Sequence, residues 1–156
     1  MAHHVWSWDR GAMTHETAGC IFCEIVAGRA EVSLVHEDET VVAWMDLNPV
    51  VRGHLLVVPR RHAVGLEDLD VATGAHMWEV AHELSRTLRR SELRCDGINL
   101  LLCDGVVAFQ TVFHVHLHVI PRHEGDGWTL NHTAHERARA LLDEDARIVR
   151  DALERR

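Results

Sequence analysis

Several features that would place a protein in a special class are missing from this sequence. No apolar run approaches the roughly 18 residues needed to cross a bilayer, and the N-terminus shows no basic-then-apolar signal peptide. Internal repeats, low-complexity segments and linkers are also absent. We therefore expect a cytoplasmic protein with no membrane partner.

Positive charge is also scarce. The 156 residues include 16 Lys and Arg against 24 Asp and Glu, a formal net charge of −8. Phosphate backbones select basic faces, so a nucleic-acid duplex is excluded as the main partner, whereas a single nucleotide needs only a few local donors. With 47% hydrophobic and 26% charged residues, the composition is that of an ordinary globular domain with its own core.

Cysteine is limited to four residues. Cys20 and Cys23 form a C-x-x-C pair, which in a cytosolic chain indicates metal binding or redox chemistry rather than a structural disulfide. Cys95 is interpreted as an ordinary free thiol.

The order of the pattern predicts the architecture. Residues 1–13 have no apolar period and are interpreted as a disordered leader or expression remnant, and residues 14–156 as a single domain. Strand-like runs precede and follow a helix, and a second helical pattern occupies the tail from about residue 138. Tight hairpin-like joins between the strands predict an antiparallel α+β domain. The central helix has its apolar residues at helical spacing: Met77, Val80, Ala81, Leu84 and Leu88.

The most unusual stretch is HVHLHVIPR, residues 114–122. Alternation with a period of two is typical of a strand, so His114, His116 and His118 are expected on one face, with Pro121 ending the ladder. Three interpretations remain open on the residues alone: a metal site, catalysis at phosphorus by an imidazole, or a polar face in water.

The surrounding motifs resemble the histidine triad (HIT) family of nucleotide hydrolases and transferases. The resemblance rests on AFQTVFHVHLHVIPR and DLNPVVRGHLLVVPRRH, and extends to CIFCEIVAG and GINLLLCDG. It covers about residues 18–123. It implies an antiparallel sheet of about five strands with a central helix and a C-terminal helix.

The resemblance also implies roles for individual residues. His116 matches the nucleophile, which attacks the α-phosphorus of a purine nucleotide conjugate and forms a nucleotidyl-histidine. An imidazole suits this task because it is largely unprotonated at pH 7 and its phosphoryl adduct is labile. The remaining matches bind the nucleotide: Asp46 the ribose; His54, Gln110, Thr111 and His118 the phosphate and leaving group; and Ile21, Ile25, Trp44 and Leu47 the base.

A structural zinc ion is expected as well. HIT proteins with this C-x-x-C pair and a histidine after Pro-x-x resemble one another in using a Cys₂His₂ site, which here implies Cys20, Cys23, His62 and His114 as ligands. No organic cofactor is expected.

The loop before the triad departs from the family pattern at two positions. Cys103 stands where the family has a second Asn, and Phe109 where it has a Gly. Phe109 puts a large ring at a position whose backbone conformation suits glycine. Both changes put substrate choice and turnover in doubt, but leave the nucleophile intact.

The sequence thus predicts a nucleotide phosphoramidase or nucleotidyl hydrolase of the Hint-like branch, whose members are typically homodimers. One alternative is a Fhit-like dinucleoside polyphosphate hydrolase. The other, from a different class, is a nucleotide- or zinc-binding partner protein in which the altered loop has silenced turnover.

Overall fold

A computed structural model describes residues 19–130 and 135–155, so the predicted leader, residues 1–13, lies outside the described residues. The elements in chain order are α1 (Ile21–Val26), β1 (Leu34–Glu37), β2 (Val41–Met45), β3 (Leu55–Pro59), α2 (Val71–Arg90), β4 (Gly97–Leu102), a 3₁₀ turn (Val106–Ala108), β5 (Leu117–Arg122) and α3 (Arg139–Leu153).

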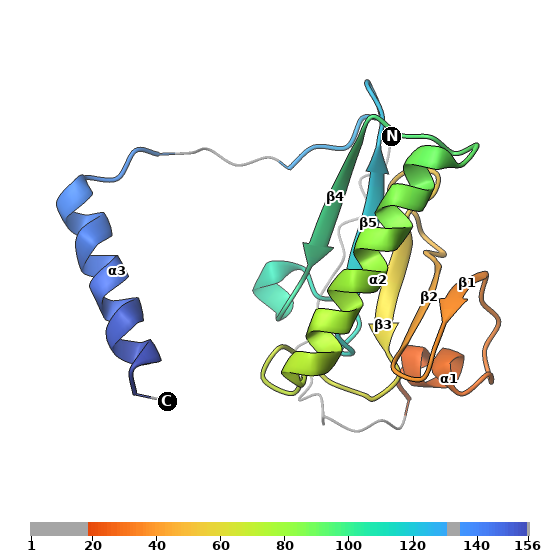
Figure 1. Cartoon of the computed structure of the whole chain (residues 1–156), viewed down its shortest axis with the longest axis horizontal. Helices are drawn as coiled ribbons and strands as arrows, with labels where there is room; N and C mark the ends of the chain where they lie inside the picture. Colours follow the sequence, from red (N-terminus) through yellow and green to blue (C-terminus); the bar gives the residue numbers. More distant parts are fainter. Residues whose placement is uncertain (1–18, 131–134, 156) are drawn as a thin grey trace, which may run out of the picture.

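The strands form one antiparallel sheet in the order β1-β2-β3-β5-β4 (Figure 1). The predicted α+β class, with a sheet of five strands, a central helix and a C-terminal helix, is confirmed. Among the described residues, no helix combines the length and apolar character needed to cross a membrane.

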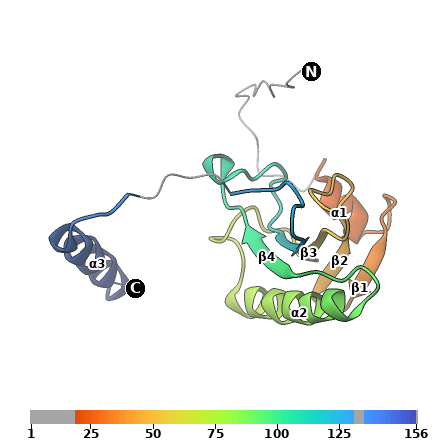
Figure 2. The same cartoon turned by 90° about the horizontal axis from the view of Figure 1, so that it is seen from above.

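Helix α2 covers one face of the sheet, and α1 lies on the opposite face (Figure 2). Asp70 caps α2, because its carboxylate accepts the backbone N–H of Thr73 at 2.9 Å. The predicted stripe on α2 is buried and packs against alternate residues of β2, β3 and β5. The other residues of β2 and β3 form a second core with α1: Phe22, Val42, Trp44, Leu56 and Val58.

The triad segment differs from the single strand that its alternation predicts. β5 begins only at Leu117, so His114 and His116 precede it. The register of β3 and β5 would place Val115 opposite Pro59, but proline has no N–H to continue the ladder. The N–H of Val115 bonds to the carbonyl of Ala63 instead, at 2.7 Å.

The end of β5 is also later than predicted, because Pro121 lies inside the strand. The carbonyl of Arg122 accepts the N–H of Asp96, so Arg122 points its backbone groups toward β4. Pro121, one residue earlier, therefore points away from β4, toward β3, whose pairing with β5 stops at Val119. The missing N–H of Pro121 thus interrupts no ladder bond.

The C-terminal helix α3 forms where the tail pattern predicts it, but its packing differs from that of α2. Figures 1 and 2 show α3 set apart from the sheet, and none of its residues is buried. Its apolar stripe, which includes Val149 and Leu153, is exposed.

Candidate active site and metal centre

The catalytic candidates gather on the sheet face opposite α2. Asp46 follows β2 and His54 precedes β3, and the N–H of Asp46 bonds to the carbonyl of His54 at 3.0 Å. Gly53, just before His54, packs closely against β5: its φ is +91°, and an added Cβ would lie 3.1 Å from Cγ of Pro121. His118 stands on the neighbouring strand β5, opposite Leu56.

His116 is the best-placed nucleophile of this group. Its side chain is buried, and its Nδ1 lies 2.8 Å from the backbone carbonyl of His114. A carbonyl only accepts hydrogen bonds, so Nδ1 carries the proton and Nε2 keeps its lone pair. Burial lowers the pKa of His116, which keeps the ring neutral at pH 7.

His54 and His118 form a hydrogen-bonded pair beside His116. Nε2 of His54 lies 2.9 Å from Nδ1 of His118, and the N–H of Val50 donates to Nδ1 of His54 at 3.3 Å. Nδ1 of His54 is therefore an acceptor, so its Nε2–H donates to His118 and leaves the Nε2–H of His118 as a donor. The pKa of His118 is lowered to about 4, mainly by burial and in addition by the neighbouring imidazoles of His116 and His54.

Asp46 lies on the Nδ1 side of the His54 ring. One carboxylate oxygen accepts the N–H of Asn48 at 2.8 Å, and the other lies 3.5 Å from Nδ1 of His54. Asp46 thus places a carboxylate beside His54, and this half-buried group retains acceptor capacity for a hydroxyl pair.

The loop before the triad uses its glutamine internally. The side chain of Gln110 is buried; it accepts the N–H of Gly105 at 2.8 Å and donates to the carbonyls of Val64 and Val112 at 2.7 and 3.2 Å. Gln110 therefore joins this loop to the segment after β3. Thr111 is exposed beside it, and direct phosphate contacts from both residues stay predictions.

The two departures from the family pattern have distinct settings in this loop. Phe109 has φ 69° and ψ 20°, a left-handed conformation that costs a non-glycine residue on the order of 1 kcal/mol, and its ring is 83% exposed. The unusual backbone conformation expected at this position is thus present. The Cys103 thiol is buried, and burial raises its pKa, so it stays protonated.

The expected base-pocket residues differ widely in exposure. Trp44 is buried and Ile25 is half-buried against the same core, whereas Ile21 is 49% exposed and Leu47 is 90% exposed. Phe22, which the sequence reasoning missed, contacts the catalytic candidate directly: its ring centroid is 5.2 Å from that of His116. The sequence signal that could have identified Phe22 is its position inside the C-x-x-C motif.

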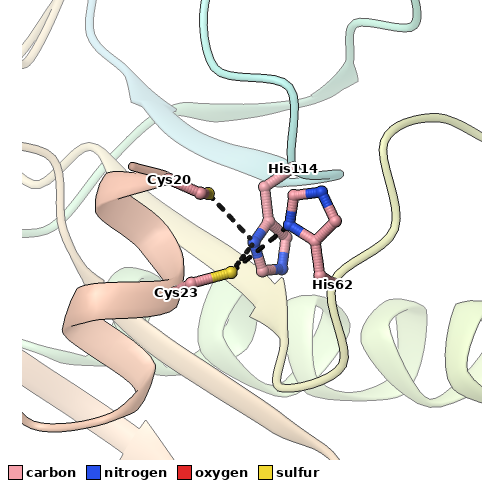
Figure 3. A group of neighbouring side chains, drawn as sticks. All are labelled: Cys20, Cys23, His62 and His114. Atoms are coloured by element: carbon pink, nitrogen blue, oxygen red, sulfur yellow. Dashed lines mark hydrogen bonds between the residues drawn. The ribbon is translucent and has the colours of Figure 1, made fainter. Parts of the chain in front are cut away.

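The four predicted metal ligands do come together, although they come from three separate segments (Figure 3). One ligand atom from each of Cys20, Cys23, His62 and His114 lies within 4.8 Å of the others. Sγ of Cys23 is 3.3 Å from Nδ1 of His62, and both sulfurs are 3.6 Å from Nδ1 of His114. Tetrahedral zinc with bonds of about 2.0–2.3 Å requires ligand separations of this size.

The hydrogen bonding of His114 also suits a metal. Its Nε2 lies 2.9 Å from the carbonyl of Pro59, so Nε2 carries the proton and Nδ1 presents its lone pair to the thiols. Burial raises the pKa of Cys23 to about 11, and the adjacent Cys20 contributes. The Cys23 thiol is therefore protonated without a cation, and a metal ion has to displace its proton.

Comparison with protein families agrees with this geometry. The HIT domain model matches residues 27–125, which is more than half of the chain. The chain belongs to the HIT family. A HIT-like protein of Mycobacterium tuberculosis is 39% identical over 134 residues, covering 86% of this chain and 92% of the relative. An adenylylsulfatase of Arabidopsis thaliana is 34% identical over 107 residues, which cover 69% of this chain and 54% of that protein.

Solved structures of HIT proteins share the fold. A HIT family protein from Bacillus anthracis has a TM-score of 0.80 at 35% identity, covering 86% of this chain and 96% of that chain. A zinc-bound histidine triad family protein from Mycobacterium smegmatis has a TM-score of 0.70 at 42% identity, covering 77% of this chain and 86% of that chain.

Proposed function

We propose that this HIT protein is an enzyme that cleaves nucleoside 5′-monophosphate conjugates, phosphoramidates or polyphosphates, through a nucleotidyl-histidine on His116. Nε2 of His116 attacks the α-phosphorus, and the bond from phosphorus to the leaving group breaks. Water then attacks the same phosphorus and releases the nucleotide and His116. The covalent intermediate divides one difficult displacement into two easier steps.

One observation carries this proposal: a buried imidazole whose Nδ1–H is bound to the carbonyl of His114 has a free Nε2 lone pair. The Nε2–H of His118 is a donor for a phosphate oxygen or the leaving group, fixed in direction by His54. Asp46 is proposed to bind the ribose hydroxyls. Ile21, Ile25, Trp44 and Leu47 are proposed to contact a purine base, with Gln110 and Thr111 near the phosphate.

A side-by-side turnover assay tests the reaction class. The substrates are an aminoacyl nucleoside phosphoramidate and a dinucleoside polyphosphate, each with adenine and with guanine. We expect faster cleavage of the phosphoramidate, as in the Hint-like branch. Preference for the dinucleotide would favour the Fhit-like alternative.

The strained Phe109 and the buried Cys103 favour a second candidate function, a nucleotide-binding protein with little turnover. Binding of the nucleoside monophosphate without cleavage of either substrate class, and without a covalent adduct, would support that alternative.

We further propose that Cys20, Cys23, His62 and His114 hold one structural Zn²⁺. The S₂N₂ donor set, its separations and the tautomer of His114 support this, as does the zinc-bound relative from Mycobacterium smegmatis. Zinc stabilises the fold by cross-linking α1 to the segments that carry His62 and His114. Elemental analysis of protein purified without chelator or nickel tests it, and one zinc per chain is expected.

Homodimerisation is proposed through the edge of the sheet at β4. β4 pairs on one side only, and a cavity of about 270 Å³ between β4 and α2 has an apolar lining. Trp78 in this lining is 58% exposed. Light scattering of the wild type and of Trp78→Ser tests the dimer, which the substitution is expected to weaken.

A further inference from the structure

Phe22 stands between the two proposed centres. It lies on α1 between Cys20 and Cys23, and its ring is buried on the sheet face that carries the active site. The ring centroid is 5.2 Å from that of Trp44 with an interplanar angle of 77°, and 5.2 Å from that of His116 at 89°. Such edge-to-face pairs favour one relative orientation of the two rings.

The imidazole of His116 needs this kind of support. A rotation of the ring by a half-turn about its Cβ–Cγ bond exchanges Nδ1 with a carbon, breaks the bond to the carbonyl of His114 and removes Nε2 from the substrate. The ring of His118 lies on one side, with centroids 4.8 Å apart, and Phe22 makes the second aromatic contact. Removing Phe22 would leave a gap into which the ring can turn.

Phe22 can keep this position only if α1 does. α1 has six residues, and its N-cap Cys20 makes no side-chain capping bond, so the helix is too short to be stable by itself. Its contacts with the sheet are the second core and the two thiols that meet His62 and His114. The aromatic ring and the two sulfurs are therefore carried by one short segment.

We propose that Phe22 is a positioning residue whose ring holds the imidazole of His116 in its reactive orientation, and that occupancy of the Cys20, Cys23, His62 and His114 site secures Phe22 there. This inference rests on the proposed function for its catalytic consequence, but not for its structural one. The segment between the two cysteines thus has a role in orienting the nucleophile as well as in holding the metal.

The structural part is tested by NMR of the full chain labelled with ¹⁵N-histidine, with the His116 signals identified by their loss in His116→Ala. Zinc-loaded wild type is expected to show one neutral His116 tautomer, protonated at Nδ1. Phe22→Leu, loaded with zinc, is expected to show averaging between tautomers. Val26→Ala, on the same helix and in the same core, is the matched control and is expected to keep the wild-type signals.

The Phe22→Leu variant separates the effect of Phe22 from a second link between the metal site and His116. His114 is a proposed zinc ligand whose carbonyl also binds His116, so metal loss alone affects both connections. Zinc-loaded Phe22→Leu keeps His114 at the metal and removes the edge-to-face contact with His116, together with the ring's contacts with Trp44 and His114. If its His116 signals match those of the wild type, the proposal is wrong, whatever the enzyme does.

Wild type treated with EDTA gives a second test, which does not depend on whether a variant folds. Chelation is expected to reproduce the averaged His116 signals, and added zinc to restore the single tautomer. An unchanged His116 spectrum after complete zinc removal would overturn the proposal.

Kinetics test the catalytic consequence. Phe22→Leu is expected to lower kcat about tenfold or more while KM changes less than about threefold, because misorientation of a nucleophile affects the chemical step. A variant with averaged tautomers and a wild-type kcat would overturn the positioning role. If even the wild type lacks turnover, the proposed function fails, and the NMR comparison still decides the place of Phe22.

Discussion

His114 and His118 lie four residues apart in one segment and have entirely different surroundings. Burial lowers the pKa of each to about 4, so both are neutral bases. His114 is held by the carbonyl of Pro59 and points Nδ1 at two thiols, whereas His118 receives its hydrogen bond from His54. The same side chain thus presents a nitrogen lone pair to two thiols in one place and keeps an Nε2–H donor in the other.

The difference shows that the partner of the ring, rather than the motif, sets the chemistry of each histidine. His76 on α2 has a third kind of surrounding. There the carboxylates of Asp38 and Glu79 raise the pKa of the imidazole, the opposite direction from the buried group.

The largest effect is expected from His116→Ala. Loss of the covalent nucleophile should lower turnover by several orders of magnitude, while the fold and nucleotide affinity change little. Single-turnover hydrolysis, with a mass-spectrometric search for the nucleotidyl adduct, measures this. The control is His82→Ala, an exposed histidine on α2. A near wild-type rate in His116→Ala would exclude the mechanism.

Next in size is the loss of a metal ligand. Cys20→Ser and His62→Ala are expected to abolish zinc binding and to lower the free energy of unfolding by a few kcal/mol, because the ion binds only the folded chain. Elemental analysis and thermal unfolding with and without chelator measure both effects. Cys95→Ser, which alters a thiol outside the cluster, should retain zinc. Unchanged, low zinc content in all variants would contradict the site.

A smaller gain is expected from restoring the family pattern in the loop. Cys103→Asn combined with Phe109→Gly should raise turnover of the phosphoramidate about tenfold, since one polar contact to a reacting group contributes about 1–3 kcal/mol. The single variants separate the two effects: Phe109→Gly relieves the left-handed strain, and Cys103→Asn adds the contact. Lower activity of the double variant would mean that the loop serves a different ligand.

The smallest effect concerns pH and the partly exposed His76. The pKa of His76 is raised in the folded chain by its bonds to Asp38 at 2.8 Å and Glu79 at 3.2 Å. Its stabilisation is therefore complete below the unfolded value near 6.5 and is lost as the pH rises through the folded pKa. Because the groups are partly exposed, we expect less than about 1 kcal/mol.

Urea unfolding of wild type and His76→Gln between pH 5 and pH 9, in steps of about one unit, measures this contribution. The stability difference should be largest at the acidic end.

Asp38 has the reverse behaviour: burial raises its pKa, but the bonds from Val41, His36, His76 and Thr40 outweigh this and lower it. Its own contribution is present above about pH 4, so it is constant over the range tested.

Helices α2 and α3 illustrate how far the sequence predicts the fold. Periodic apolar residues predict both helices, and both are present. Burial is a different matter, because the stripe of α2 is covered by the sheet and that of α3 is exposed. Periodicity reports an amphipathic helix, not the surface that it packs against.

The candidate site also divides into what the sequence predicts and what only the packing reveals. Histidines at alternate positions and the C-x-x-C pair are visible as motifs, and the resemblance assigns them roles. Phe22 was missed because, apart from its place inside the C-x-x-C motif, a phenylalanine in a short apolar run looks like any core residue. Its contact with His116 joins positions far apart in the sequence, and only the packing of α1 on the sheet brings them together.

By itself, the sequence determined the α+β class, the place of the helices and the family, because these depend on local periodicity and on motifs. The tertiary structure decided which nitrogen of each triad histidine is free: Pro59 orients His114, the His114 carbonyl orients His116, and His54 orients His118. An imidazole has two equivalent-looking nitrogens, and a proton rests on the one that faces an acceptor. That acceptor is a backbone or side-chain group whose position follows from the fold, so no motif specifies it.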